Sequence, residues 1–410
     1  MKRIFLDYAA GKDNPNAIYK EGRDASARLA KVRKTIASVI SSAPNEVLLT
    51  SWGTEANSAI RSLFTASSFG YLLRKHGQSR HSEQAPHVLT TTIEHESLLS
   101  LFGDLAKSGV KVTYVAPNKE GIVSVSDIEK SLRPNTVLVS VMYANNEIGT
   151  IQPIKEISKM LRNRKNLAPK TLAYVRPGAN PLSRAVALRK GVSATSSYGR
   201  LIFHSDCVQA PGLLQINVQS LGVDLASFSA PKFGGPAGAG FLYRRRWVGS
   251  LTPDRDLREN VSVSLAENMC EALVRAESRR EKEVARLTKL RDYFIAGVLK
   301  NISTSRLNGS RDLRLAHNAN FVFPVESELL VLELDMAGVA VSGGAACSAQ
   351  GCEDGSHVII ALGKTKQEAK SSVRFSLGAD TRKADLDYVI KLLPEIINRH
   401  TNIWPSQKRQ

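Results

Sequence analysis

The sequence has few cysteines, no long apolar run and fewer acidic than basic residues. Four cysteines in 410 residues are too few for a disulfide framework, and none forms the CxxC pair that zinc and redox sites use. No stretch approaches the roughly 18 uncharged apolar residues that a membrane span needs, and no apolar segment of a signal peptide follows the basic residues at the start. We therefore expect a cytoplasmic protein with free thiols, no metal site and no membrane association.

The basic residues are unevenly distributed. Lys and Arg outnumber Asp and Glu by 56 to 38, which gives a formal net charge of +18. Nine of the basic residues and no acidic residue lie within residues 161–200, which we interpret as a basic insertion in a surface loop. The excess predicts an acidic partner or a nucleic acid, although charge alone does not indicate fold or chemistry.

Hydrophobic periodicity alternates between the helical and the strand pattern, which predicts an α/β fold with a mostly parallel sheet flanked by helices. A helix is expected over residues 16–40 and a long charged helix over residues 265–299. Seven short apolar segments are expected to be strands: residues 46–50, 87–93, 111–116, 136–143, 201–206, 225–229 and 238–244. We predict a large domain over residues 15–250 and a smaller α+β domain over residues 251–410, the latter joined by the N-terminal segment 1–14.

Three polar motifs follow the predicted strands, where open α/β sheets bind ligands. Gly53 and Thr54 precede a helix and could cradle a phosphate, although most such pairs are plain helix caps. Asp206 ends a strand and could hold a protonated ring nitrogen, with Gln209 near the same ring. Lys232 lies in a tight turn and could form a Schiff base. Together these groups are what pyridoxal 5'-phosphate (PLP) requires.

The motifs "IEHES", "VSVMYANNEIGTIQPI", "HSDCVQA", "PKFGGPAGAG", "SGGAACS" and "SVRFSLG" occur in the order seen in a known family. The chain resembles the cysteine desulfurases of the NifS/IscS type, which belong to the class V aminotransferase group. The resemblance implies the PLP-dependent transferase fold of type I, a homodimer, and conversion of L-cysteine to L-alanine.

The resemblance also implies a role for individual residues. His95 would stack on the cofactor ring and assist proton transfer, and Arg374 would bind the substrate carboxylate with its two-pronged guanidinium. Asn146 would lie near the phenolic oxygen of the cofactor and the substrate. The remaining cofactor contacts would be Gly53, Thr54, Asp206, Gln209, Ser229 and the Schiff-base residue Lys232.

Cys347 lies among small residues in "SGGAACS", which matches the family's mobile loop with its catalytic cysteine. Small neighbours leave a thiolate exposed to attack the sulfur of bound cysteine and carry it away as a persulfide. Cys207 and Cys270 are better interpreted as small buried side chains. Cys352 lies outside the motif and is a candidate relay thiol.

A sulfur acceptor is implied, either an acidic iron–sulfur scaffold protein or a partner in tRNA thiolation. The chain departs from the family at Pro231, where the usual histidine contacts the phosphate, and in the glycine-rich loop that usually follows. Three alternatives stay open: a degenerate PLP-fold homologue that acts as a binding or scaffold protein, a selenocysteine lyase-like enzyme, and a basic nucleic-acid binder.

Overall fold

The computed structural model describes residues 4–7, 14–65, 85–163, 201–248, 262–343 and 355–401. Its larger sheet has seven strands in the order β1-β7-β6-β5-β4-β2-β3. The strands are β1 (Val47–Thr50), β2 (His87–Thr91), β3 (Lys111–Val115), β4 (Thr136–Ser140), β5 (Ile202–Asp206), β6 (Leu225–Ser229) and β7 (Gly240–Arg244). β7 is antiparallel to both neighbours, and the other pairs are parallel.

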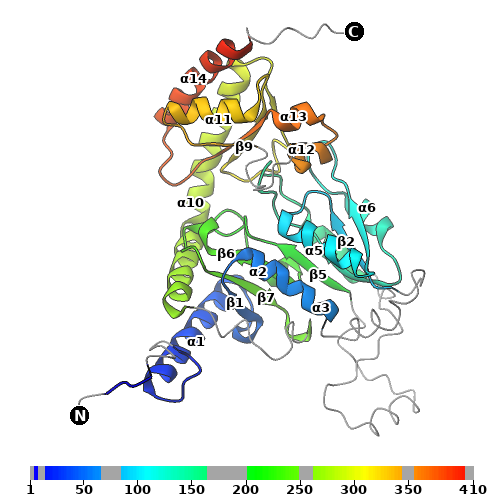
Figure 1. Cartoon of the computed structure of the whole chain (residues 1–410), viewed down its shortest axis with the longest axis vertical. Helices are drawn as coiled ribbons and strands as arrows, with labels where there is room; N and C mark the ends of the chain where they lie inside the picture. Colours follow the sequence, from blue (N-terminus) through cyan, green and yellow to red (C-terminus); the bar gives the residue numbers. More distant parts are fainter. Residues whose placement is uncertain are drawn as a thin grey trace.

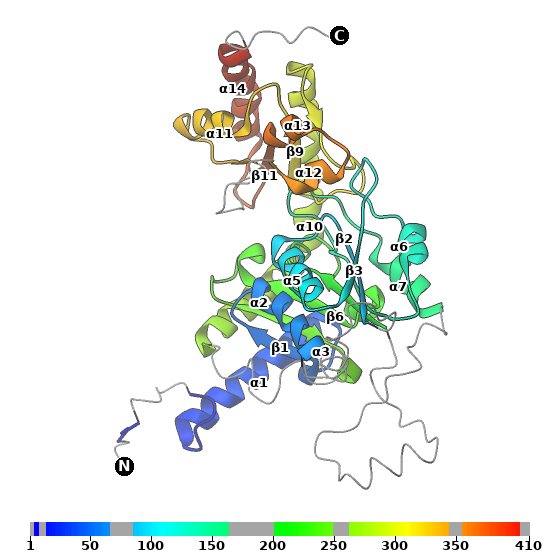
Figure 2. The ribbon, with the colours of Figure 1, turned by 45° about the vertical axis from the view of Figure 1, so that its right-hand side comes forward.

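Both faces of the larger sheet are buried, as the apolar composition of its strands requires. Neighbouring residues on a strand point to opposite faces, and Val88 and Leu89 on β2 are both fully buried. One face packs against α2 (Gly53–Ser58), α3 (Ser62–Thr65) and α5 (Glu96–Lys107), which lie together in Figure 2. The opposite face packs against α1 (Lys20–Ile40), α6 (Val125–Ser131), α7 (Ile154–Asn163) and α9 (Val218–Leu221).

A long helix, α10 (Val263–Asn301), runs from the larger sheet to a smaller one, as Figure 1 shows. The apolar face of its first third is buried in the core beside α1, and Phe294 near its end packs edge-on against Phe321 and Phe375 of the smaller sheet. The smaller sheet is antiparallel in the order β10-β11-β9-β8.

The remaining elements belong to this second unit or connect strands. The smaller sheet consists of β8 (Arg306–Leu307), β9 (Asn318–Val322), β10 (Ser342–Gly343) and β11 (Ser372–Ser376). Its helices are α11 (Ser327–Met336), α12 (His357–Ala361), α13 (Lys366–Lys370) and α14 (Lys383–Thr401). Short 3-10 helices are η1 (Pro44–Glu46), η2 (Ala59–Arg61), η3 (Ala230–Phe233) and η4 (Arg246–Val248).

The predicted fold class is confirmed: a mostly parallel sheet is flanked by helices, and a smaller α+β unit follows. The division into domains stays a prediction, because its boundary at residue 251 lies outside the described residues. In the N-terminal segment, Asp7 accepts a hydrogen bond from the Tyr19 hydroxyl, and Phe5 stacks edge-on against the same ring. Most of the predicted basic insertion, residues 164–200, also lies outside the described part.

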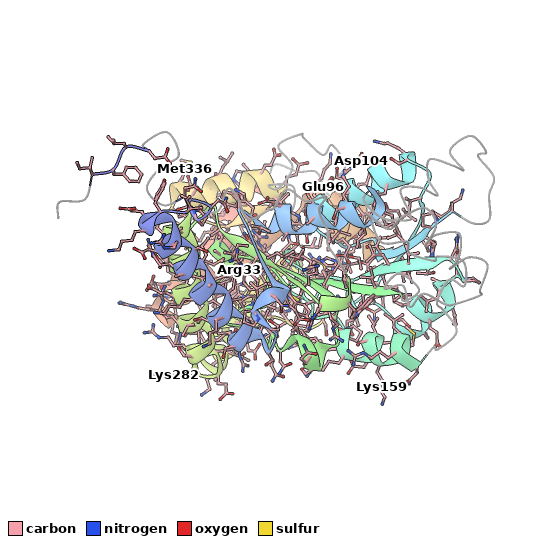
Figure 3. The ribbon with its side chains drawn as sticks, turned by 90° about the horizontal axis from the view of Figure 1, so that it is seen from below. Arg33, Glu96, Asp104, Lys159, Lys282 and Met336 are labelled. Atoms are coloured by element: carbon pink, nitrogen blue, oxygen red, sulfur yellow. The ribbon has the colours of Figure 1, made fainter. Side chains whose placement is uncertain are left out.

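Charged side chains on the helices lie at the surface of the protein. Glu96 on α5, Lys159 on α7 and Lys282 on α10 are exposed and lie at the periphery of the ribbon in Figure 3. No helix within the described ranges is long and apolar enough to cross a membrane.

Candidate active site

A cavity of about 250 Å³ lies where the chain leaves β1, β2, β4, β5 and β6. Segments far apart in the sequence meet here because the carboxyl ends of parallel strands share one edge of a sheet. The cavity is lined by Trp52, Gly53, Thr54, Asn57, His95, Met142, Ala144, Asn146, Asp206, Val208, Gln209, Ser229, Pro231 and Lys232. All eight residues predicted to contact a cofactor are among them.

Asp206 is the buried anion of the cavity. It ends β5 and is only 5% exposed. Its Oδ2 accepts a hydrogen bond from Asn57 Nδ2 at 2.9 Å, and its Oδ1 accepts one from the backbone N–H of Val208 at 2.9 Å. These donors fix the carboxylate plane, and each oxygen keeps a lone pair for a cationic group in the cavity.

Gly53 brings the start of α2 into contact with the end of β6. A Cβ atom at this position would lie 2.9 Å from both Ser229 Cβ and Val208 Cγ2, closer than real Cβ contacts allow. Thr54 follows immediately, and both Thr54 and Ser229 line the cavity. The packing therefore requires the absence of a Cβ atom at Gly53.

Lys232 lies on η3, directly after β6, and its side chain is exposed to the cavity. It has no ion-pair partner among the described residues, so its amine is available to a ligand. Pro231 precedes it and also lines the cavity. Proline contributes neither a side-chain donor nor a backbone N–H at this point.

His95 is the N-cap of α5. Its Nδ1 accepts a hydrogen bond from the backbone N–H of Ser97 at 3.2 Å and lies 2.9 Å from the Ser97 hydroxyl. This cap orients the imidazole in the cavity wall. Ser97 in turn accepts a hydrogen bond from Asn57 Nδ2 at 3.1 Å.

Arg374, on β11 of the smaller sheet, is not among the residues lining the cavity. Its Nη1 donates a hydrogen bond to the backbone oxygen of Asn146, which does line the cavity, at 2.9 Å. Its Nε is buried and has no hydrogen-bond partner among the described residues. The hydrogen bond to Asn146 therefore anchors the guanidinium beside the cavity.

The loop that carries Asn146 is fixed by its neighbours. Asn145 is fully buried, and its Oδ1 accepts hydrogen bonds from the backbone N–H groups of Glu147 and Ile148 at 2.8 and 2.9 Å. The backbone oxygen of Glu147 accepts hydrogen bonds from Asn318 and Asn320 on β9. The smaller sheet thus holds the cavity loop as well as Arg374.

Glu94 is a buried carboxyl group that sequence reasoning missed, although it precedes His95 in "IEHES". Its Oε1 accepts hydrogen bonds from the Thr91 hydroxyl at 2.7 Å and from the backbone N–H of Met142 at 3.0 Å. Its Oε2 is buried without a partner among the described residues. Burial raises the pKa of Glu94 to about 8, against those hydrogen bonds and with a smaller contribution from the negative charge of Asp206.

Asn57 is a cavity-lining residue that sequence reasoning also missed. It lies one turn after Gly53 on α2 and is 1% exposed. Its position in "TSWGTEANS", on the buried face of the helix that begins at the cavity, is the signal that points to it.

Of the four cysteines, the structure describes two. Cys207 and Cys270 are buried and free, as predicted, and burial raises the pKa of both thiols. Cys347 and Cys352 lie outside the described residues. β10 ends at Gly343, immediately before the segment that contains them.

The residues present fit PLP. A buried carboxylate, an amine without an ion-pair partner, an imidazole and a close-packed glycine turn line one cavity. Asn57 Oδ1 in the cavity wall is also buried without a hydrogen-bond partner among the described residues. Within the same part of the chain, no cluster of His, Cys, Asp and Glu could hold a metal ion.

Comparisons with known proteins agree with this chemistry. The family described as aminotransferase class-V matches residues 1–168 and 190–256, and the interruption falls within the basic stretch predicted to be an insertion. Cysteine desulfurase IscS of Dictyoglomus turgidum is 35% identical, over 100% of this chain and 98% of its own length. Cysteine desulfurase IscS of Methanosarcina thermophila is 33% identical, over 97% of this chain and 88% of its own length.

A solved structure of a NifS-like protein has the same fold. It superimposes with a TM-score of 0.74 at 24% sequence identity, over 94% of this chain and 92% of its own.

Proposed function

Because the chain belongs to the class-V aminotransferase family, as a PLP-dependent cysteine desulfurase, we propose that the cavity converts L-cysteine to L-alanine and that Cys347 receives the sulfur. One observation carries the proposal: Lys232, Asp206 and His95 reach a single cavity from three separate segments of the chain. An amine, a carboxylate and an imidazole are the groups that a PLP-dependent reaction uses, and they meet at the carboxyl ends of the parallel strands, where open α/β sheets bind ligands.

PLP, when bound, supplies an electron sink for the bonds that change at the substrate carbons. Asp206 would hold the ring nitrogen in its protonated form, because its carboxylate is buried and oriented by two donors. Lys232 would carry the cofactor covalently. The remaining contacts would be Gly53, Thr54 and Ser229 at the phosphate, Gln209 and Asn146 at the ring oxygen, and His95 against the ring.

Substrate binding would rest on Arg374. Its hydrogen bond to the backbone oxygen of Asn146 orients the guanidinium, and its buried Nε is a donor without a partner among the described residues. A carboxylate accepting from the guanidinium would place the α-carbon of cysteine toward the cavity. His95 would move a proton at the substrate.

The sulfur transfer balances without an added oxidant or reductant. The Cys347 thiolate attacks the substrate sulfur, and an S–S bond forms as the C–S bond breaks. The electron pair of the C–S bond stays on carbon, which takes up a proton to give L-alanine. The products are one alanine and one persulfide on Cys347.

A sulfur acceptor would then take the outer sulfur of the persulfide and leave the Cys347 thiol. The net charge of +18 favours an acidic acceptor, and we propose that the basic stretch 161–200 attracts it. Deleting residues 169–189, which the family pattern does not include, should leave alanine formation unchanged and reduce the salt dependence of acceptor binding. Unchanged salt dependence of acceptor binding would contradict a role of residues 161–200 in attracting the acceptor.

The cysteine assignment is tested by mass spectrometry of the protein after reaction with L-cysteine in the absence of a reductant. We expect one added sulfur on Cys347 in the wild type and no added sulfur in Cys347→Ser. The matched control Cys270→Ser, which replaces a buried thiol, should carry one added sulfur on Cys347 like the wild type. Serine is the informative replacement because its hydroxyl is hardly ionised at neutral pH. Sulfur on Cys352 in Cys347→Ser would transfer the carrier role to that residue.

A further inference from the structure

Four polar residues form a continuous hydrogen-bonded chain along the wall of the cavity. Asn57 Nδ2 donates to Asp206 Oδ2 at 2.9 Å and to the Ser97 hydroxyl at 3.1 Å. The Ser97 hydroxyl lies 2.9 Å from His95 Nδ1. The hydrogen-bonded chain therefore links Asp206 and His95, which both line the cavity.

The direction of each hydrogen bond follows from the carboxylate. Asp206 can only accept, so the Asn57 amide must turn its Nδ2 toward it, and a flipped amide would place oxygen against oxygen. The two protons of Nδ2 are then used on Asp206 and Ser97. Asn57 Oδ1 has no partner among the described residues, so nothing there favours the flipped orientation.

Ser97 passes this direction on to His95. Its hydroxyl oxygen accepts from Asn57, so its own proton is free to be donated to His95 Nδ1. The backbone N–H of Ser97 also points at Nδ1, at 3.2 Å. The backbone N–H cannot reverse its role and opposes a proton on Nδ1, and the Asn57 amide on the Ser97 oxygen favours the hydroxyl as a donor toward the same nitrogen, so the neutral ring carries its proton on Nε2.

We propose that Asn57 and Ser97 are positioning residues that hold His95 as the Nε2–H tautomer while Asn57 also fixes the Asp206 carboxylate. His95 then meets a ligand in the cavity as a hydrogen-bond donor through Nε2, which has no partner among the described residues. The inference rests on the proposed function for its relevance to catalysis, but the tautomer is a property of the protein alone.

The test is nitrogen NMR of protein labelled with ¹⁵N-histidine, recorded at pH 8 on both PLP-loaded protein and apoprotein. The His95 signals are assigned by their loss in His95→Gln. We expect the ring proton on Nε2 in the wild type. In Asn57→Leu, the Ser97 oxygen loses the amide that favours the hydroxyl as a donor toward His95, and the Nδ1–H fraction should rise about fivefold, the equivalent of one net hydrogen bond.

Ser97→Ala provides a second variant that keeps the backbone donor, and it should raise the Nδ1–H fraction by a similar factor. The matched control is Asn217→Ala, which removes an asparagine that accepts a hydrogen bond from the Ser220 N–H at the start of α9 and is not among the residues lining the cavity. It should leave the His95 signals unchanged.

Two results would overturn the proposal: a wild-type proton on Nδ1, or unchanged His95 signals in both Asn57→Leu and Ser97→Ala. Alanine formation by the wild type is measured separately. Absence of alanine with the proton on Nε2 would contradict the proposed function and leave the positioning role of Asn57 and Ser97 intact. Alanine formation with the proton on Nδ1 would contradict that positioning role and leave the proposed function intact.

Discussion

Replacing Glu94 with glutamine should change the pH dependence of stability. Burial raises the pKa of Glu94 from its ordinary value of 4.5 to about 8 in the folded protein. Above pH 4.5 the unfolded chain loses the proton, whereas the folded protein keeps it until about pH 8. The stability contributed by the neutral group is therefore complete below pH 4.5 and is lost as the pH rises toward 8.

The magnitude follows from the two pKa values. Each pH unit between the two pKa values lowers the free energy of unfolding of the wild type by about 1.4 kcal/mol. The full interval lowers it by roughly 5 kcal/mol relative to a protein with a side chain that does not titrate at this position. Glutamine keeps the oxygen that accepts from Thr91 and Met142. The stability of Glu94→Gln relative to the wild type should therefore rise with pH.

The measurement is urea unfolding of apoprotein between pH 5 and pH 7, so that cofactor binding does not contribute. The difference in free energy of unfolding between Glu94→Gln and the wild type should change by about 2.7 kcal/mol across this interval. Glu96→Gln, at an exposed position two residues away, is the matched control. Its free energy of unfolding should change with pH in the same way as that of the wild type. A constant difference for Glu94→Gln would refute the reasoning.

Three further substitutions test the cavity. Pro231→His should tighten PLP about ten- to hundredfold in apoprotein titrations by adding a charge-assisted donor, and equal or weaker affinity would show that other groups already hold the phosphate. Gly53→Ala should lower the free energy of unfolding in urea by about 1–3 kcal/mol, because the added Cβ would meet Ser229. The control Gly103→Ala, in open space on α5, should raise it by about 0.5–1 kcal/mol. Equal effects of the two substitutions would contradict the packing argument. Arg374→Lys should raise KM for L-cysteine more than it lowers kcat in steady-state assays, and an unchanged KM would exclude Arg374 from carboxylate binding.

The sequence predicted the strands of the larger sheet well and helix ends less well. β6 (Leu225–Ser229) has the predicted limits, because a short apolar segment between turn residues has little freedom. The first helix begins at Lys20 rather than at residue 16. Asn14 accepts hydrogen bonds from the N–H groups of Asn16 and Ala17, and this local turn competes with helix formation.

Other features depend on contacts that a single sequence does not encode locally. The reversed direction of β7 leaves no trace in its apolar pattern, because antiparallel and parallel strands buried on both faces have the same composition. Asn57 was missed for a similar reason. On α2 it is an ordinary helix residue, and its role appears only when the fold brings Asp206, 149 residues away in the sequence, within 2.9 Å.

The most direct test of the proposed chemistry is the formation of L-alanine from L-cysteine by purified protein supplied with PLP. We predict alanine production by the wild type and none by Lys232→Ala, which should also lose the yellow absorbance of the bound cofactor. Asn217→Ala, away from the cavity, should produce alanine like the wild type. Alanine production by Lys232→Ala at the wild-type rate, or no alanine from PLP-loaded wild type, would contradict the assignment.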